Sequence, residues 1–499
     1  MRFLNLLFLL DENMKIPVLL IIAVILLFMV FVARLSSKLN VPLIIIALAI
    51  GIIFGSDVTG LIYFDDAIFT RDVANIALIF ILFAGGFGTK SNHFKPVAKP
   101  AMFLATAGVL ITAVITAAFF SFITGWPFLK SLLVSAIISS TDAAAVFSIL
   151  RTRSISRNVS SITEIESAAN DPMAIISTTF ILQLILGSGI NTTVSMALFL
   201  WQLAGGVAFG ILTGIAGTYL YNKIRNIDIG YYYVFLIGTI LFSFSIADMS
   251  RASGMLSAFF TGYVLGNKKL PFKSGITSFT EILSFIANVG LFIMLGLLVF
   301  PHRFSEIWIT GIIVFLALTF VGRPVAVLIC TAFCGLKLRE KLFISWGGLR
   351  GAVPIVLATY PSAAGIDDEH QIFNIVFFAV ALSILIQGTT IGWLADFFKL
   401  TRKSRMKPGQ TMELVTIHDT DYELIQIFID PDLYKGELKI SEMELPPGVT
   451  ITMINRNNTV IAPRGSSIIY PGDVLSVLVS GEKIKKITKQ VLGSFTAIS

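Results

Sequence analysis

Charged residues are scarce in this chain of 499 residues: only 13% are Asp, Glu, Lys or Arg, whereas 55% are hydrophobic. The mean hydropathy is +0.85, and no soluble domain of this length has such a composition. Repeated apolar runs of about 18–25 residues instead predict an all-α polytopic protein in a lipid bilayer, because helices satisfy their own backbone there.

Several residue types that particular functions require are also scarce. The two cysteines, Cys330 and Cys334, lie four apart in one apolar run, so we interpret them as small core residues. With four histidines, no metal-ligand cluster, no phosphate-binding loop and no Gly-x-Ser-x-Gly motif, we expect no enzyme activity and no cofactor. The net charge of +7 does not indicate a nucleic-acid partner, because the basic residues occupy short loops between apolar runs.

The apolar runs predict thirteen membrane spans. They are Ile16–Ala33, Val41–Gly55, Val73–Gly88, Val97–Thr124, Phe128–Leu150, Ile165–Leu186, Thr193–Tyr221, Tyr231–Ala247, Ser253–Gly266, Thr277–Phe300, Glu306–Phe333, Leu342–Tyr360 and Gln371–Phe398. Lys and Arg occupy alternate loops and favour the cytoplasmic side. This alternation predicts an external N-terminus and a cytoplasmic C-terminus.

An odd number of spans permits inverted repeats, with spans one to six and eight to thirteen joined by span seven. Polar or helix-breaking residues interrupt the fifth span of each repeat, at Ser139–Asp142 and at Gly347–Pro354. Non-helical backbone at that depth is tolerated only where it is buried in protein or lines a cavity. We therefore expect two broken helices in the membrane.

The stretch Thr163–Pro172 places carboxylates at the head of an apolar run. A carboxylate at bilayer depth costs about 2.5–3.5 kcal/mol, so Asp171 is a functional-site candidate. Ser167 lies four residues earlier on the same helical face, with Asn170 between them in angle. Their oxygen atoms suit an alkali cation or a proton. In the alternative interpretation, Asp171 caps a helix or forms a structural salt bridge.

The expected breaks contain polar residues of their own. Asp142 would compensate the positive ends of two half-helices, and the exposed carbonyl of Thr141 would be available to a cation, although polar packing is the alternative. Arg350 must be paired at this depth. Glu166 points about 140° away from Asp171, so we predict a structural Glu166–Arg350 ion pair, with Asp142 as the competing partner.

Other polar and small residues receive structural interpretations. Glu281, Arg323 and Asp248 lie near predicted span ends, where we expect them to snorkel or to pair at the interface. The pair Gly85–Gly86 and the glycines of Gly205–Gly214 favour close packing of helices.

The composition changes after Phe398. We divide the chain into a transmembrane domain (residues 1–400), a basic linker (401–411) and a C-terminal domain (412–495). The sequence of the C-terminal domain alternates apolar and polar residues between turns that are rich in Pro and Gly. It predicts a small, mostly β (α+β) cytoplasmic domain that a helix near Glu482–Val491 closes.

Three motifs taken together resemble the cation:proton antiporter-1 family of Na⁺/H⁺ and K⁺/H⁺ exchangers. They are Glu166–Asp171, Thr141-Asp142 and Gly348–Gly351, and the resemblance covers about the first 400 residues. It implies a homodimer in the plasma (inner) membrane of a prokaryote, in which a mobile six-helix core moves against a dimer domain. Electroneutral exchange, with one cation or one proton bound at a time, is the mechanism that the resemblance implies.

The resemblance also assigns roles to individual residues. Asp171 is implied as the carboxylate that binds the ion and the proton, and no metal is implied beyond the transported cation. Asn170, Ser167 and Thr141 are implied as supporting ligands, and Glu166 with Arg350 as the stabilising pair. Some family members have an acidic residue near Ala84–Gly86, where this chain has none, so a ligand seen in some Na⁺-selective relatives is missing.

The C-terminal stretch resembles the C-terminal lobe of regulator-of-K⁺-conductance domains, or TrkA-C-like domains. The resemblance rests on Leu445–Ile451, Ile461–Ser466 and Tyr470–Val477. Such lobes dimerise and can bind a small regulatory ligand. Antiporters that carry only this lobe resemble the K⁺/H⁺ branch, which favours K⁺.

The sequence therefore predicts a secondary transporter that exchanges K⁺, or Na⁺, for H⁺ around Asp171. The alternatives are a Na⁺-selective antiporter and a ligand-gated monovalent cation channel. A channel needs a selectivity filter or a ring of pore residues, and the sequence contains no such motif. A membrane-tethered sensor is the weakest alternative, because an anchor does not need so many spans.

Overall fold

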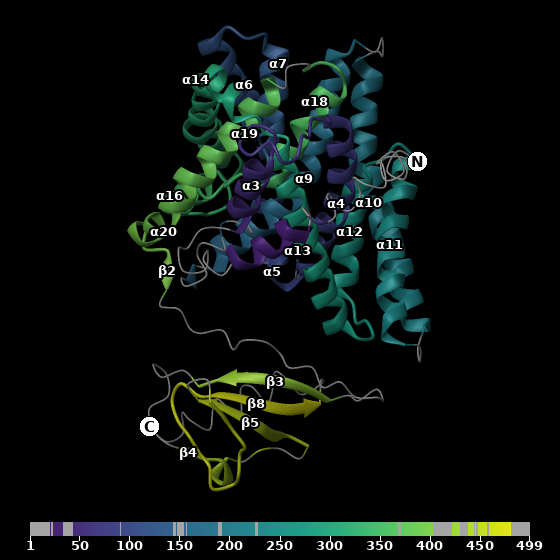
Figure 1. Ribbon diagram of the computed structural model, residues 1–499. Coiled ribbons are helices and arrows are strands. Elements are labelled where there is room, and N and C mark those ends of the chain that lie inside the picture. Colours follow the sequence, from purple (N-terminus) through teal and green to yellow (C-terminus); the bar gives the residue numbers. More distant parts are fainter. Residues whose placement is uncertain are drawn as a thin grey trace. The chain divides into compact units, whose positions relative to one another are not determined.

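The computed structural model divides the chain into two compact units, Met1–Arg402 and Lys403–Ser499, each of which is described by itself. The described residues are 20, 23–32, 43–89, 91–142, 146, 154–155, 157–187, 192–224, 228–367, 371–402, 422–429, 438–443, 445, 448–456 and 459–480. Within them, the first unit is mostly helical, with one short strand pair of β1 (Ser154–Ile155) and β2 (Thr401–Arg402), and the second is built mainly from strands (Figure 1). The prediction of a mostly helical membrane domain followed by a small β domain is confirmed.

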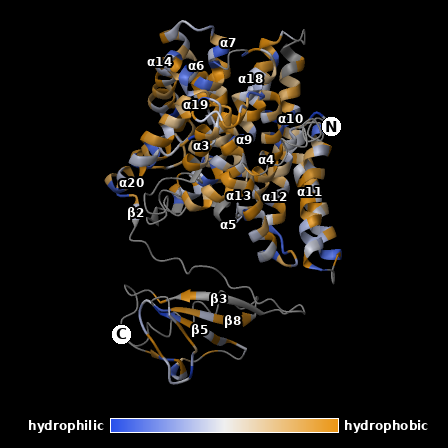
Figure 2. Cartoon of the chain, in the orientation of Figure 1, coloured by the Kyte–Doolittle hydropathy of each residue, from blue (hydrophilic) through white to orange (hydrophobic). Residues whose placement is uncertain are grey.

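Seven helical stretches in the described part of the chain are long and apolar enough to cross a membrane. They are Ala67–Gly88, Val97–Thr124, Met196–Lys223, Ile229–Met249, Lys273–Leu297, Pro301–Cys330 and Gln371–Phe397. Four shorter apolar helices cover Ala23–Val32, Ile45–Phe54, Phe128–Ile137 and Ala352–Ala363. Hydrophobic residues predominate throughout the helical unit (Figure 2). The count of thirteen spans and the inverted repeat stay predictions.

The helices of the first unit pack in two groups. We call the first the glycine-packed group: α3 (Leu43–Phe54), α4 (Ala67–Gly88), α10 (Thr192–Lys223), α11 (Ile229–Met249), α12 (Gly254–Asn267) and α13 (Lys273–Leu297). We call the second the broken-helix group: α5 (Ser91–Phe103), α6 (Val109–Thr124), α7 (Phe128–Ile137), α9 (Arg157–Ile185), α14 (Phe304–Leu316), α15 (Arg323–Cys330), α16 (Leu338–Trp346), α17 (Ala352–Leu357), α18 (Thr359–Ala363), α19 (Gln371–Leu382) and α20 (Gly388–Phe397).

Three π-helical turns lie in the broken-helix group, where each joins two α-helices end to end. They are η1 (Leu104–Gly108) between α5 and α6, η3 (Ala317–Gly322) between α14 and α15, and η4 (Ser383–Gln387) between α19 and α20. A π-helical turn inserts extra backbone and so re-aims the side chains that follow it, and such turns are frequent at functional sites.

Backbone-to-backbone contact holds the glycine-packed group together. A Cβ at Gly86 in α4 would collide with the carbonyl oxygen of Phe259 in α12, and one at Gly262 in α12 would collide with that of Phe83. The expectation of close packing is therefore correct for Gly86. It is wrong for Gly85, because a Cβ there would meet nothing within 4 Å.

The two expected helix breaks both appear in the structure. Helix α7 ends at Ile137, and residues 138–142 are not helical. Residues 347–351 separate α16 from α17 in the same way. The second half of the predicted fifth span lies outside the described residues, apart from Val146.

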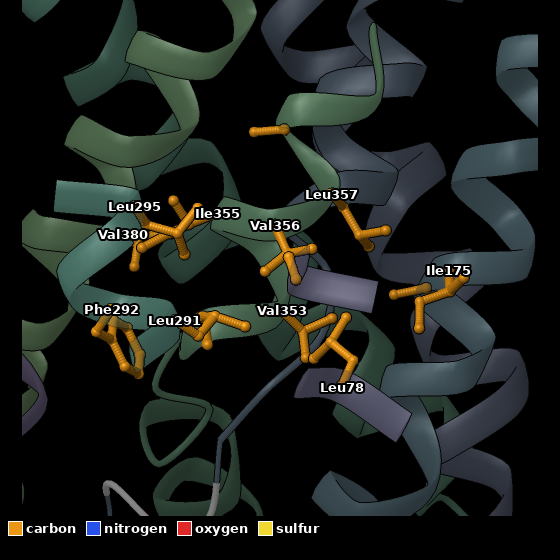
Figure 3. Close-up of a cluster of buried hydrophobic side chains, with 14 of the residues drawn as sticks. Leu78, Ile175, Leu291, Phe292, Leu295, Val353, Ile355, Val356, Leu357 and Val380 are labelled. Carbon is orange, nitrogen blue, oxygen red and sulfur yellow. The ribbon is translucent and has the colours of Figure 1, made fainter. Parts of the chain in front are cut away.

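A layer of buried apolar side chains joins the two groups near the second break (Figure 3). Figure 3 shows Leu78 of α4 beside Val353 of α17, and Phe292 and Leu291 of α13 on the other side. Leu78, Val356 and Leu357 are 0% exposed, so this layer is fully packed. This layer borders a cavity that lies between the two groups.

The second unit contains a four-stranded antiparallel sheet and a two-stranded sheet. The first has the order β3 (Tyr422–Phe428), β8 (Val474–Ser480), β5 (Thr450–Arg456) and β6 (Thr459–Ile461), and the second pairs β4 (Leu438–Lys439) with β7 (Ile468–Ile469). Arg456 ties the turn before β8 to β5 through two hydrogen bonds to Asp473, of 2.9 and 2.8 Å. The predicted linker beyond Arg402 and the predicted helix near Glu482–Val491 lie outside the described residues.

The glycine contacts generate a stability prediction. Gly262→Ala forces a methyl group against the Phe83 carbonyl oxygen, and overpacking of this kind costs about 1–3 kcal/mol. We expect a lower thermal unfolding temperature for the detergent-solubilised protein. The matched control is Gly238→Ala in α11, where a Cβ meets nothing within 4 Å. Equal unfolding temperatures for the two variants would contradict the proposed packing.

Candidate functional site

The two non-helical stretches cross each other, and this crossing organises the site. The backbone N–H of Asp142 donates a hydrogen bond of 2.7 Å to the carbonyl oxygen of Leu349. Gly351 lies so close to Asp142 that an added Cβ would be 2.5 Å from a carboxylate oxygen. The carboxylate of Asp142 therefore lies at the start of α17, where a helix carries partial positive charge. This position fits the predicted role in charge compensation.

Arg350 is buried in the crossing, with 2% of its surface exposed. Its Nη1 donates hydrogen bonds of 2.8 and 2.6 Å to the carbonyl oxygens of Ser139 and Ser140. These carbonyls belong to the non-helical stretch that follows the end of α7. The guanidinium group therefore stabilises the first break from the second.

The predicted Glu166–Arg350 ion pair is wrong, because the structure pairs Glu166 with Arg323. The Nη1 of Arg323 lies 2.5 Å from an Oε1 of Glu166, and both side chains are almost fully buried. Arg323 follows the π-helical turn η3, and its Nε lies where a side chain at Gly348 would otherwise project. Arg350 instead donates to the backbone carbonyls that follow α7.

The location of Arg323 also corrects its expected interfacial role. We expected this residue to snorkel near a span end, but it is 3% exposed and lies among the broken helices. The signal in the sequence was a second arginine within an apolar run, between Gly322 and Pro324. A buried charge requires a partner, and the carboxylate of Glu166 is the partner of Arg323.

Three of the predicted ligand residues come together beside the first break. Ser167 donates a hydrogen bond of 2.8 Å to the carbonyl oxygen of Thr141, and the Nδ2 of Asn170 donates one of 2.7 Å to the Thr141 hydroxyl. We expected the Thr141 carbonyl to be free, but it accepts the hydrogen bond from Ser167. Its second lone pair remains available. Asn170 is 0% exposed, and its hydrogen bond fixes the position of the Thr141 side chain.

Asp171 lies in the middle of α9, which runs without interruption from Arg157 to Ile185. The alternative interpretation, in which Asp171 caps a helix that begins at Pro172, is therefore wrong: Pro172 is inside the helix. The Asp171 side chain reaches a cavity of about 580 Å³ that Thr141, Asp142 and Ser167 also line.

The cavity lies between the two helix groups. Helices α3, α4 and α13 line it on one side, and α9, α17 and the first break line it on the other. Figure 3 shows three residues of its wall, Leu78, Phe292 and Val353, within the apolar layer. Two wall positions, Gly85 and Gly88, leave space beside them, since a Cβ at either would meet nothing within 4 Å.

The sequence reasoning missed the polar face of α13. Glu281, Ser284 and Asn288 line the cavity, and their spacing of three and four residues places them on one helical face. Glu164 lines the opposite side, seven residues before Asp171 and so on the same face of α9. The i, i+3, i+7 spacing of polar residues was the available signal. Glu281 was misread because of its place near a span end.

The described lining residues give the cavity the character of a cation site. Its ionisable groups are the carboxylates of Asp142, Glu164, Asp171 and Glu281, and no described lining residue is Lys or Arg. Hard oxygen atoms from Thr141, Ser167 and Asp171 converge at the crossing. Such a set can hold an alkali cation, or a proton on a carboxylate.

The buried ion pair leads to a testable consequence. Glu166→Gln leaves the Arg323 guanidinium buried without a counter-charge, which typically costs about 3–5 kcal/mol. We expect a lower yield of folded protein and a lower unfolding temperature. A double-mutant cycle with Arg323→Gln should show strong coupling, and one with Arg350→Gln weaker coupling. Equal coupling for both arginines would contradict the observed pairing.

Comparison with known proteins agrees with this geometry. A model of the sodium/hydrogen exchanger transmembrane family matches residues 21–397, and a model of the TrkA-C domain matches residues 437–492. The K⁺/H⁺ antiporter NhaP2 of Shewanella oneidensis is 34% identical over 453 residues, which cover 90% of this chain and 79% of that protein. The K⁺/H⁺ antiporter NhaP of Alkalimonas amylolytica is 32% identical over 462 residues, covering 92% and 80%.

A solved structure is also similar. The sodium proton antiporter MjNhaP1 from Methanocaldococcus jannaschii superimposes with a TM-score of 0.66 at 26% sequence identity, covering 77% of this chain and 99% of that one. The chain therefore belongs to the sodium/hydrogen exchanger family of multi-pass cation/proton antiporters, and it carries a TrkA-C domain after its membrane domain.

Proposed function

We propose that the protein exchanges K⁺ for H⁺ with 1:1 stoichiometry, and that Asp171 binds the two ions in turn. The observation that carries this proposal is the position of Asp171, on the wall of a cavity between two helix groups and next to two crossed helix breaks. A carboxylate there binds one proton or one cation, because a proton neutralises the charge that attracts the cation. Competition at one group couples the two fluxes.

The surrounding residues have separate roles in this proposal. Ser167 and Thr141 supply neutral oxygen atoms to the cation, and Asn170 positions Thr141. Glu166 is neutralised by Arg323 and takes no part in transport. Asp142 and Arg350 stabilise the crossing. Because only Asp171 changes its occupancy, the exchange carries no net charge.

Alternating access follows from the location of the cavity. The cavity lies between the glycine-packed group and the broken-helix group, so movement of one group against the other would expose it to opposite sides in turn. The breaks and a π-helical turn occur at corresponding places in α5–α7 and α14–α17, which supports the proposed inverted repeat. We retain thirteen spans, a homodimer in the inner membrane of a prokaryote and cytoplasmic basic loops as parts of this proposal.

The choice of K⁺ rests on two observations. Two relatives that share more than 30% identity over at least 90% of the chain are named K⁺/H⁺ antiporters. The wall of α4 beside the cavity also lacks an acidic residue, with Ala84 and Gly85 in its place. The TrkA-C domain supports regulation of exchange by a small cytoplasmic ligand.

The first test measures proton flux in proteoliposomes with an internal pH dye when K⁺ or Na⁺ is added. We expect flux with K⁺ that Asp171→Asn abolishes and that an imposed membrane potential does not change. A tenfold higher proton concentration should raise the apparent KM for K⁺ by up to about tenfold, because the ions compete. Glu306→Gln, an exposed acidic position in α14 away from the cavity, should retain full activity.

Three outcomes would overturn parts of this proposal. Cation flux without proton counterflow would identify a channel, and exchange by Asp171→Asn at the normal rate would remove Asp171 from the mechanism. Equal flux with K⁺ and Na⁺ would leave the exchange intact and remove the choice of K⁺.

Ion selectivity provides a second test. Ala84→Glu adds a carboxylate to the α4 wall, next to the space at Gly85. An additional anionic ligand strengthens the field around the ion and favours the smaller cation. We expect the KM for Na⁺ to fall relative to that for K⁺ by about tenfold, equivalent to about 1.4 kcal/mol. Ala84→Gln is the matched neutral control, and an equal shift in both variants would rule out a charge effect.

A further inference from the structure

The cavity occupies only one half of the membrane domain. Its lining residues in α4 begin at Leu78 and extend to Thr89, next to the basic loop that contains Lys90. In α9 and α13 they include Glu164 and Glu281, which are exposed and lie nearer the basic-loop ends of their helices. The cavity is therefore on the side of the basic loops.

The opposite side of the cavity is closed by the apolar layer of Figure 3. Val353 is on the cavity wall, while Val356 and Leu357, further along α17, are 0% exposed. Leu78 of α4 and Phe292 of α13 complete the closure from the glycine-packed group. An ion has no path through this layer while it is packed.

One polar contact lies just beyond the apolar layer. The hydroxyl of Tyr360 in α18 donates a hydrogen bond of 2.6 Å to the Oδ1 of Asn75 in α4. Asn75 lies one helical turn beyond Leu78, and Tyr360 lies three residues beyond Leu357. Both side chains are partly buried. The bond joins the broken-helix group to the glycine-packed group.

The Tyr360–Asn75 bond lies within the most extensive contact between the two helix groups. Among the described helices, α18 with α4 is the largest contact between the groups, and the pairs α17–α4, α13–α17 and α4–α9 are smaller. A movement that separates the two groups on the acidic-loop side would separate α18 from α4. The Tyr360–Asn75 bond must then break.

We propose that Tyr360 and Asn75 form a latch that holds the cavity closed on the acidic-loop side and open toward the basic loops. This inference rests on the proposed alternating access. A single neutral hydrogen bond has a modest net stability, so its loss should raise the population of the opposite state by about 2- to 10-fold. A latch of this strength biases the resting state without preventing turnover.

The test uses a reporter cysteine in the closed layer. Leu357→Cys is introduced into the full-length protein with Cys330→Ser and Cys334→Ser, and a membrane-impermeant maleimide is added from the acidic-loop side of proteoliposomes. Adding Tyr360→Phe, which removes only the hydroxyl, should raise the labelling rate about 2- to 10-fold. Tyr219→Phe, at a position in α10 that is 66% exposed, is the matched control and should not change it.

A second substitution separates the latch from a general loosening of the fold. Asn75→Leu should raise the labelling rate as Tyr360→Phe does, and the double variant should add little, because both remove the same bond. Backbone hydrogen exchange in α18 should increase in all three variants and remain unchanged in α12. Additive effects, or an unchanged labelling rate, would overturn the latch.

Failure of the latch can be distinguished from failure of the proposed exchange. Unchanged labelling of the Tyr360→Phe variant, together with K⁺/H⁺ exchange that depends on Asp171, would remove the latch alone. Loss of the dependence on Asp171 would remove the proposed function, whatever the labelling shows.

Discussion

The crossing of two unwound backbone stretches is the feature on which the rest of the site depends. Each break leaves carbonyl and N–H groups without helical partners at a depth where water does not supply them. The Asp142–Leu349 hydrogen bond satisfies one pair, and Arg350 satisfies two carbonyls at the end of α7. The irregular backbone then costs little, and its remaining oxygen atoms are available at a fixed place beside Asp171.

The buried charges divide into two sets with different partners. Glu166 and Arg323 neutralise each other outside the cavity, so that pair contributes to structure and not to binding. Asp171 lies five residues further along α9 and faces the cavity, where it has no such cation beside it among the described lining residues. The separation explains how two carboxylates five residues apart can differ in function: helix geometry directs them about 140° apart.

Much of this arrangement can be predicted from local sequence, and the remainder requires tertiary contacts. Apolar length placed the span Val97–Thr124 correctly, and polar residues within apolar runs identified both breaks. Sequence could not decide which arginine reaches Glu166, because a π-helical turn aims Arg323 and α7 provides carbonyls to Arg350. The polar face of α13 was missed because its relation to Asp171 arises only when the two helix groups pack together.

Neighbouring glycines in α4 show how one helix serves both stability and transport. Gly86 faces α12, where any side chain would collide with the backbone, so its role is to fix α4 within the glycine-packed group. Gly85 is rotated by about 100° and faces the cavity, where it leaves room. Gly85 and Gly88 therefore leave open space on the α4 side of the cavity. The broken-helix group contacts α4 less extensively than α12 and α13 do, and one of its contacts is the Tyr360–Asn75 hydrogen bond.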